Sequence, residues 1–252
     1  MDPVIFNIGN FEIRWYSVIL LCAFLVGVFF INRESKRFEV PKDFTFNLVF
    51  WTLIFGILGA RIYYVIFDWG YYSSHINEIW KIWNGGLAIY GGIIGAIIYT
   101  WLFCRRKKIV FFNFADLGAP YLALSQSIGR WGNFVNQEAY GYETNVPWKM
   151  GIFDSAISDY IYVHPTFFYE SICNFILFFI LMKLSKNRKF GGQVFFAYMI
   201  SYGLIRSVIE GLRTDSLMMG NFRVSQVLSV IFVVMFGILY YRAEKCRTKD
   251  TK

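Results

Sequence analysis

The stretch WYSVILLCAFLVGVFFI, residues 15–31, runs for 17 positions without a charged side chain. A helix of roughly 17 to 25 mainly apolar residues can cross a hydrocarbon layer about 30 Å thick. Further apolar stretches of similar length lie near 46–67, 86–103, 114–130, 166–184, 191–209 and 224–241. The sequence therefore predicts an all-α, polytopic integral membrane bundle with about seven transmembrane helices.

The composition supports a membrane protein. The chain has 252 residues, a mean hydropathy of +0.44, and only 17% charged residues, against about 25% in ordinary soluble domains. On the predicted topology, 17 of its 25 Lys and Arg residues fall on one side of the membrane. Short loops rich in these residues stay cytoplasmic, so we expect the N-terminus outside and the C-terminus inside. The net charge of +8 then reflects topology, and no nucleic-acid partner is expected.

Several other features limit the possible classes. The N-terminal residues lack the basic region and small-residue cleavage site of a signal peptide, which favours an uncleaved first span. The four Cys are widely separated and there are only two His, so we expect neither a disulfide, a metal site nor a cofactor. No repeat or linker divides the chain. We expect one transmembrane domain over 1–252, with a small external cap at about 131–165.

Three arginines lie within the apolar stretches, where an ionisable residue costs about 2.5 kcal/mol or more and usually marks a functional site. They are Arg61, Arg130 and Arg206, each near the predicted outer end of its span. Tyr202 and Glu210 lie four residues to either side of Arg206, on the same helix face. Alternatively, each Arg pairs with an acid between helices or extends its side chain to the headgroups.

The most polar stretch is GRWGNFVNQEAYG, residues 129–141. Its glycines allow the backbone to bend and approach neighbours, and Arg130 supplies a forked cationic donor. Tyr90 precedes a Gly-rich helix-packing pattern on the predicted outer side, although an interfacial aromatic is an equally ordinary interpretation. The sequence predicts an anion-binding pocket toward the outer leaflet, suited to a phospholipid phosphate. Its further polar members are Asn133, Asn136, Gln137 and Glu138.

At these residues the chain resembles the prolipoprotein diacylglyceryl transferase family, whose signature is close to G-R-x-G-N-F-[aliphatic]-N-x-E-x-x-G. Other similar segments are GARIYYV, GGLAIYGG, FFNFADLGAP, HPTFFYES and YGLIRSVIEGLRTD. The resemblance implies an enzyme of the bacterial cytoplasmic (inner) membrane. It would transfer the diacylglyceryl group of phosphatidylglycerol to the lipobox cysteine of prolipoprotein signal peptides, forming a thioether and releasing glycerol phosphate.

The resemblance also implies roles for particular residues. Arg130 and Arg206 match essential arginines, and Tyr90 stands where many members have His, so a mechanism based on that imidazole does not transfer unchanged. The general base is open among Tyr90, Glu138 and Glu210. The expected substrate-binding residues, besides Arg130, are Arg61, Asn113, Asn133, Gly141, Tyr202 and Gly211.

Two other functions remain as alternatives. A transporter or channel for a small anion would also use intramembrane arginines, but the chain shows no inverted repeat and its polar groups stop in the outer half. A non-catalytic binding protein for a lipid headgroup would use the same arginines without turnover.

Overall fold

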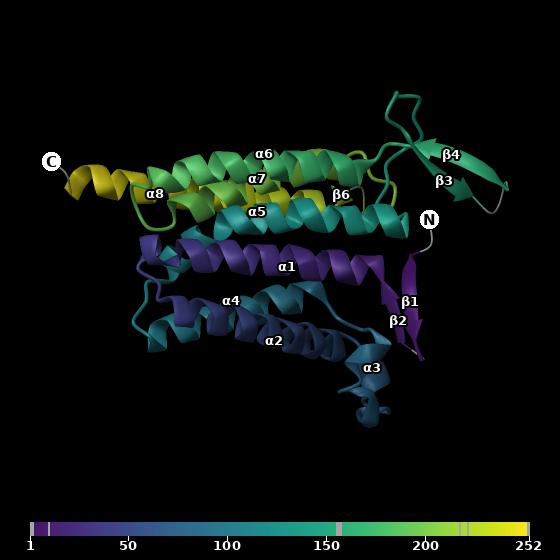
Figure 1. The fold of residues 1–252 in the computed structure, drawn as a ribbon, viewed down its shortest axis with the longest axis horizontal. Helices are drawn as coiled ribbons and strands as arrows, with labels where there is room; N and C mark the ends of the chain where they lie inside the picture. The colour runs from purple at the N-terminus through teal and green to yellow at the C-terminus, as the bar shows by residue number, and fades with distance from the viewer. Residues whose placement is uncertain (1–2, 10, 155–157, 217, 221, 251–252) are drawn as a thin grey trace. The chain divides into compact units, whose positions relative to one another are not determined.

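The computed structural model describes residues 3–9, 11–154, 158–216, 218–220 and 222–250. This part of the chain contains seven helices of 18 residues or more (Figure 1). Each coincides with one of the seven predicted apolar stretches. They are α1 (Trp15–Glu34), α2 (Lys42–Phe67), α4 (Ile89–Arg106), α5 (Phe111–Asn136), α6 (Thr166–Lys186), α7 (Gln193–Glu210) and α8 (Val224–Asp250).

Within the described residues, four helical segments are long and apolar enough to cross a membrane: Trp15–Phe38, Thr45–Phe67, Thr166–Lys186 and Val224–Thr248. They identify the chain as a membrane protein. Helices α5 and α7 are less apolar because they carry the polar residues of the site described below, and α4 ends in two arginines. The count of seven spans and the orientation of the termini stay predictions.

The contacts divide the chain into two compact units, which are described separately. The first comprises Met1–Phe30 and Ala115–Lys252, and the second comprises Ile31–Phe114. The first unit contains most of α1 and α5 together with α6, α7 and α8, and the second contains α2 and α4. The expectation of a single domain over the whole chain stays a prediction.

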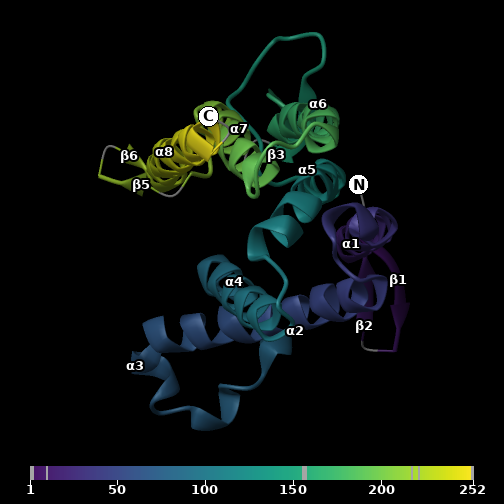
Figure 2. The same ribbon diagram turned by 90° about the vertical axis from the view of Figure 1, so that its left-hand side faces the viewer.

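In the first unit, α7 lies between α8 and the α5–α6 pair, as the end-on view shows (Figure 2). A cluster of apolar and small side chains fills the space between α5, α6 and α7, and α1 packs on α5. Ser125 Oγ donates to the carbonyl of Ala23 at 2.9 Å, and a Cβ on Gly132 would lie 2.5 Å from Cδ2 of Tyr16. Gly132 thus allows α1 and α5 to approach closely. The cluster is Ala119, Ala123, Leu177, Leu181, Val194 and Tyr198.

The first residues of the predicted cap, 131–136, are helical. Helix α5 continues through the polar stretch to Asn136, so its glycines 129 and 132 bend no loop there. The helix ends because Gln137 adopts a left-handed φ of 52°, and the amide of Glu138 donates back to the carbonyl of Asn133 at 3.0 Å, which is a common way to close a helix C-terminus.

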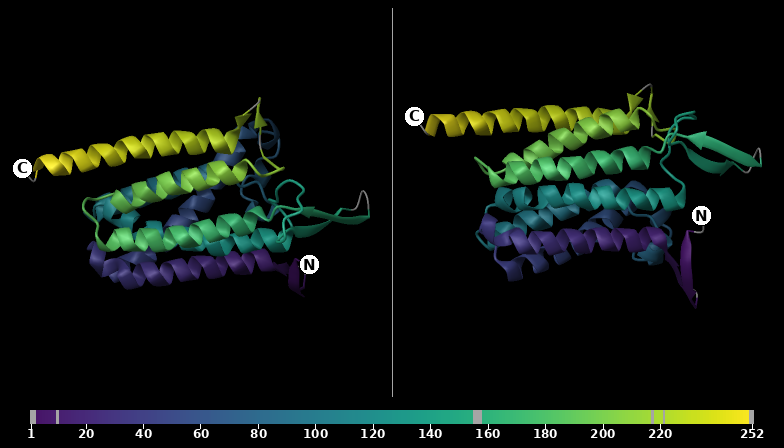
Figure 3. Two further views of the ribbon diagram at one scale, coloured as in Figure 1. Left: turned by 90° about the horizontal axis from the view of Figure 1, so that it is seen from above. Right: turned by 45° about the horizontal axis from the view of Figure 1, so that its top comes forward.

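The cap itself contains an antiparallel hairpin of β3 (Met150–Asp154) and β4 (Asp159–Val163), which extends beyond the ends of α5 and α6 (Figures 1 and 3). Two further short hairpins pair β1 (Val4–Ile8) with β2 (Phe11–Arg14) and β5 (Met218–Met219) with β6 (Phe222–Arg223). The chain is mostly helical, as predicted, but these hairpins were not anticipated, since each is too short for its alternation to stand out in sequence.

In the second unit, glycines hold α2 and α4 together. A Cβ on Gly59 would lie 2.5 Å from the carbonyl oxygen of Gly91 and 3.0 Å from Cα of Gly95. The backbones therefore touch, which confirms the helix-packing pattern predicted for the glycines that follow Tyr90. The connection between the helices contains α3 (Trp69–Tyr72) and two 3-10 turns, η2 (Ile76–Glu78) and η3 (Ile82–Asn84).

Candidate functional site

Three helices of the first unit bring two arginines to one carboxylate. Arg130 Nη2 on α5 donates to Glu170 Oε1 on α6 at 2.6 Å, and Arg206 Nη1 on α7 lies 3.2 Å from Glu170 Oε2. Arg206 Nη2 is also 2.6 Å from Glu210 Oε2. The side chains of Glu170 and Glu210 are each 2% exposed, whereas those of Arg130 and Arg206 are 22% and 17% exposed. The acids are buried, and the two arginine side chains are partly exposed.

The periodicity of α7 places its polar residues together, as predicted. The hydroxyl of Tyr202 donates to Glu170 Oε1 at 3.4 Å, and Arg206, one turn later, reaches both Glu170 and Glu210. A helix repeats a face every three to four residues, so these side chains form one polar stripe directed at α6.

Asn133 and Glu138 join this cluster at the end of α5. Asn133 Oδ1 accepts from Arg130 Nη1 at 3.4 Å, and its Nδ2 donates to Glu138 Oε1 at 2.9 Å. Asn136 Nδ2 contacts the same Glu138 oxygen at 3.4 Å. Glu138 is exposed, and the closure of the helix at Gln137 brings it back toward Asn133.

Gly141 and Gly211, which the resemblance places among the substrate-binding residues, follow the ends of α5 and α7. The amide of Gly141 donates to the carbonyl of His164 at 2.9 Å, and a Cβ on Gly141 would lie 2.8 Å from both His164 Cβ and the carbonyl of Leu212. Gly211 directly follows α7, where a Cβ would lie 3.0 Å from the carbonyl of Val208. Gly141 thus allows the segments that contain His164 and Leu212 to pack closely, whereas the nearest neighbour of a Cβ on Gly211 belongs to the preceding helical turn.

An ion pair outside the helices holds the chain that follows α7. Arg213 donates to both carboxylate oxygens of Asp215, at 2.9 and 2.7 Å, and this hydrogen bonding lowers the pKa of Asp215. Arg223 donates to the carbonyl of Glu210 and, at 2.7 Å, to the hydroxyl of Tyr142. The segment after α7 is thereby tied to the cap.

The remaining predicted site residues, Arg61, Tyr90 and Asn113, belong to the second unit. Arg61 is 6% exposed. Its guanidinium donates to four backbone carbonyls, those of Glu78, Ile79, Gly85 and Gly86, at 2.7 to 3.0 Å. These contacts satisfy a buried cation without an anion.

Tyr90 stands in the first turn of α4 and is 44% exposed, and Asn113 stands in the first turn of α5, where its amide donates to the carbonyl of Val110 at 2.9 Å. The expected grouping of these residues with Arg130 and Arg206, which belong to the first unit, stays a prediction.

Sequence reasoning missed Glu170, the residue to which both arginines bind. A signal was present, because Glu170 is an ionisable residue inside the apolar stretch 166–184, and the cost of such a residue applies to acids as well as to arginines.

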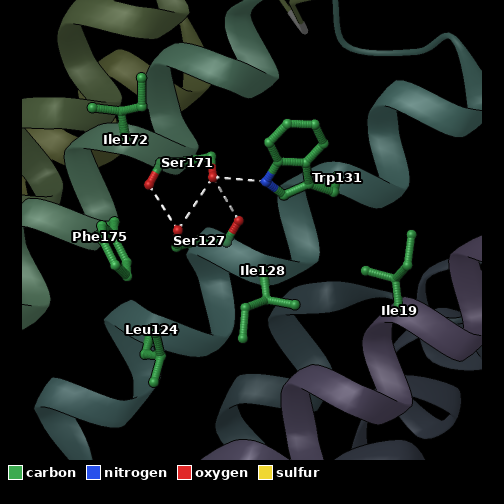
Figure 4. Close-up of a pocket in the computed structure, with 8 residues that line it drawn as sticks. All are labelled: Ile19, Leu124, Ser127, Ile128, Trp131, Ser171, Ile172 and Phe175. Atoms are coloured by element: carbon green, nitrogen blue, oxygen red, sulfur yellow. Dashed lines mark hydrogen bonds between the residues drawn. The ribbon is translucent and has the colours of Figure 1, made fainter.

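A groove of about 510 Å³ lies beside the cluster, between α1, α5 and α6 (Figure 4). Ser127 Oγ donates to the carbonyl of Ser171, and Ser171 Oγ donates to the carbonyl of Ser127, both at 2.8 Å. Trp131 Nε1 donates to Ser171 Oγ at 3.2 Å. Because these polar groups satisfy one another, the groove offers mainly apolar surface. Its other lining residues are Ile19, Leu124, Ile128, Ile172 and Phe175.

Comparison with known proteins agrees with the sequence signature. The sequence model of the prolipoprotein diacylglyceryl transferase family matches residues 3–242. A phosphatidylglycerol–prolipoprotein diacylglyceryl transferase of Finegoldia magna is 44% identical over 97% of both chains. Proteins of the same name from Pediococcus pentosaceus and Clostridioides difficile are 41% and 42% identical, over 99% and 93% of this chain and 93% and 92% of theirs. The chain therefore belongs to the prolipoprotein diacylglyceryl transferase family.

Proposed function

We propose that this chain transfers the diacylglyceryl group of phosphatidylglycerol to the thiol of the lipobox cysteine in bacterial prolipoproteins, which is the first step of lipoprotein maturation. The observation that carries the proposal is the convergence of Arg130 and Arg206, from different helices, on the two oxygens of Glu170. Membership of the family and the names of its relatives support the choice of substrates.

The reaction needs an anion site at the departing group. The cysteine sulfur attacks the glyceryl carbon, the bond from that carbon to the phosphate oxygen breaks, and the electron pair leaves with glycerol phosphate. Arg130 and Arg206 stabilise the negative charge on this leaving group, because fixed donors act strongly in a site of low dielectric. A guanidinium has five N–H donors, more than the contacts to Glu170, Asn133 and Glu210 use. Phosphate oxygens take donors on the exposed side of the cluster.

The thiol must lose its proton, since the thiolate is the nucleophile. Glu138 is exposed and carries two amide contacts, whereas Glu210 is buried and paired with Arg206. Of these two acids, Glu138 is the more accessible to an incoming peptide. Tyr90 remains the third candidate, as a residue that positions the substrate or accepts its proton.

The apolar groove suits an acyl chain of the lipid. Trp131 and Ser171, two of its lining residues, directly follow Arg130 and Glu170 in sequence, so the groove adjoins the anion site. An acyl chain bound there removes no unpaired polar group from water, because the polar groups of the groove are already hydrogen-bonded to one another.

We place the protein in the bacterial cytoplasmic (inner) membrane with seven spans, the N-terminus outside, the C-terminus in the cytoplasm and the active site toward the outer leaflet. The distribution of Lys and Arg supports this orientation. Labelling of single cysteines introduced at Tyr160 and at Arg242 with a membrane-impermeant reagent tests it, because only the first should react from outside in intact cells.

The direct test incubates the purified protein with phosphatidylglycerol and a lipobox peptide and measures the mass of the peptide. We expect a mass increase equal to the diacylglyceryl group, which a transporter or a binding protein would not produce. Arg130→Ala should abolish transfer while the protein remains folded, and Arg242→Ala, at an exposed position of α8, should retain it. Transfer by Arg130→Ala at the wild-type rate would refute the assigned role.

A further inference from the structure

A second layer of polar side chains lies one turn along each helix from the arginines. Gln126 precedes Arg130 by four residues on α5, Asn174 follows Glu170 by four on α6, and Tyr198 precedes Tyr202 by four on α7. Four residues along a helix correspond to about 6 Å and to nearly the same face.

The helix register brings this amide layer, Gln126, Asn174 and Tyr198, together. The α5–α6 contacts pair residue 130 with 170 and residue 127 with 171, so the antiparallel register sets Gln126 close to the level of Asn174. The contacts of Glu170 with Tyr202 and Arg206 likewise set Asn174 near Tyr198 and Tyr202. The side chains of Gln126 and Tyr198 are hydrogen-bonded to each other.

Part of this layer has unused hydrogen-bonding capacity. Asn174 is 0% exposed, and among the described residues neither its Nδ2 nor its Oδ1 has a hydrogen-bond partner. Gln126 Oε1 is buried and also lacks a partner in the described part of the chain. A buried polar group without a partner costs free energy and calls for an explanation such as a ligand. The free groups are two acceptor oxygens and one amide nitrogen, which carries two N–H donors.

We propose that this amide layer binds the hydroxyl groups of the glycerol headgroup and so selects phosphatidylglycerol among phospholipids. The inference rests on the proposed function. A hydroxyl both donates and accepts, so two hydroxyls can satisfy the two acceptor oxygens and the two N–H donors of the amide nitrogen. Ester oxygens of the acyl chains only accept, and would leave Gln126 Oε1 and Asn174 Oδ1 unpaired. The headgroup hydroxyls are separated from the phosphate by two or three carbons, a length that one helical turn accommodates.

The test compares phosphatidylglycerol with phosphatidylpropanol of the same acyl chains, which has the same phosphodiester charge but no headgroup hydroxyl. Values of kcat/KM are measured with the full chain in mixed micelles and a lipobox peptide. We expect the wild type to prefer phosphatidylglycerol by about 100-fold or more, because a site built to bind a hydroxyl rejects an analogue without it.

Asn174→Leu, which is close in shape, should lower this preference at least about tenfold, chiefly by raising KM for phosphatidylglycerol, while the thermal stability is unchanged or higher. Gln126→Met should act in the same direction and decides the matter if Asn174→Leu does not fold. Ile176→Leu, on the exposed face of α6, is the matched control and should keep the wild-type preference.

Equal use of the two lipids by the wild type, or a wild-type preference in the folded variants of the amide layer, would overturn the inference while leaving the transferase function intact. A folded wild type that modifies the peptide with neither lipid would instead refute the proposed function itself.

Discussion

Glu170→Gln tests whether one buried carboxylate holds the two arginines in place. The change keeps the size of the side chain but removes its charge, so Arg130 loses its acidic partner on α6 and Arg206 retains only Glu210. Hydrogen bonds to charged groups contribute about 1.5–3 kcal/mol each. Because both arginines are partly exposed, we take the lower value for each of the two contacts, about 3 kcal/mol in all.

If transfer requires both arginines in this arrangement, 3 kcal/mol corresponds to a rate loss of about 100-fold. The assay measures kcat and KM with phosphatidylglycerol and a lipobox peptide, alongside thermal unfolding in detergent. Glu210→Gln is the matched control: it removes one contact of Arg206 and should cost only about tenfold. A folded Glu170→Gln protein with the wild-type rate, or a larger loss in Glu210→Gln, would show that Glu170 does not organise the site.

Three further changes test other parts of the structure. Arg61→Gln should lower the melting temperature, because about 1.5–3 kcal/mol is lost for each charge-assisted contact to a backbone carbonyl. An unchanged melting temperature together with lost lipid binding would instead support the substrate-binding role expected from the sequence. Gly59→Ala should destabilise the protein by about 1–3 kcal/mol through overpacking. Gly56→Ala should not, because its Cβ would lie 3.5 Å or more from its neighbours. Equal melting temperatures for the two variants would contradict the close packing of α2 on α4 at Gly59. The lowered pKa of Asp215 predicts that its pairing with Arg213 stabilises the fold above about pH 4 and that this stabilisation is lost as the pH falls through the lowered pKa. The difference in stability between the wild type and Asp215→Asn should therefore disappear in acid. Unfolding measured at several pH values checks this.

The sequence predicted the helices well because the membrane imposes a strong and simple signal. Each long apolar stretch became a helix, and the period of α7 correctly placed Tyr202, Arg206 and Glu210 together. The end of α5 was less predictable. The stretch 129–141 is rich in glycine and polar residues, which is typical of a loop, yet packing of Gly132 on Tyr16 favours a helix up to Asn136. Tertiary contact overrode local composition.

The three arginines of the apolar stretches show a second limit of sequence reasoning. Arg61, Arg130 and Arg206 lie at similar predicted depths and received the same interpretation. Their partners separate them: Arg61 binds carbonyl groups of a turn nearby in the second unit, whereas the other two bind Glu170. The cost of burying a cation is offset by whichever acceptors the fold supplies. The identity of those acceptors depends on how segments distant in the sequence pack, so the sequence of one helix does not predict it.

The pairing of charges also explains how two arginines can lie close together in the structure. Two guanidinium groups close together would repel, and this repulsion is strong where water is scarce. Glu170 lies between them and Glu210 flanks one, so the cluster of Arg130, Arg206, Glu170 and Glu210 is balanced at two positive and two negative charges. On the proposed function, a bound phosphodiester would add a negative charge beside the arginines, and the charge that develops on the departing phosphate would meet donors that Glu170 and Glu210 already hold in place. Donors that are already fixed need no rearrangement during the reaction, and in this proposal the buried carboxylates of Glu170 and Glu210 fix the guanidinium groups of Arg130 and Arg206.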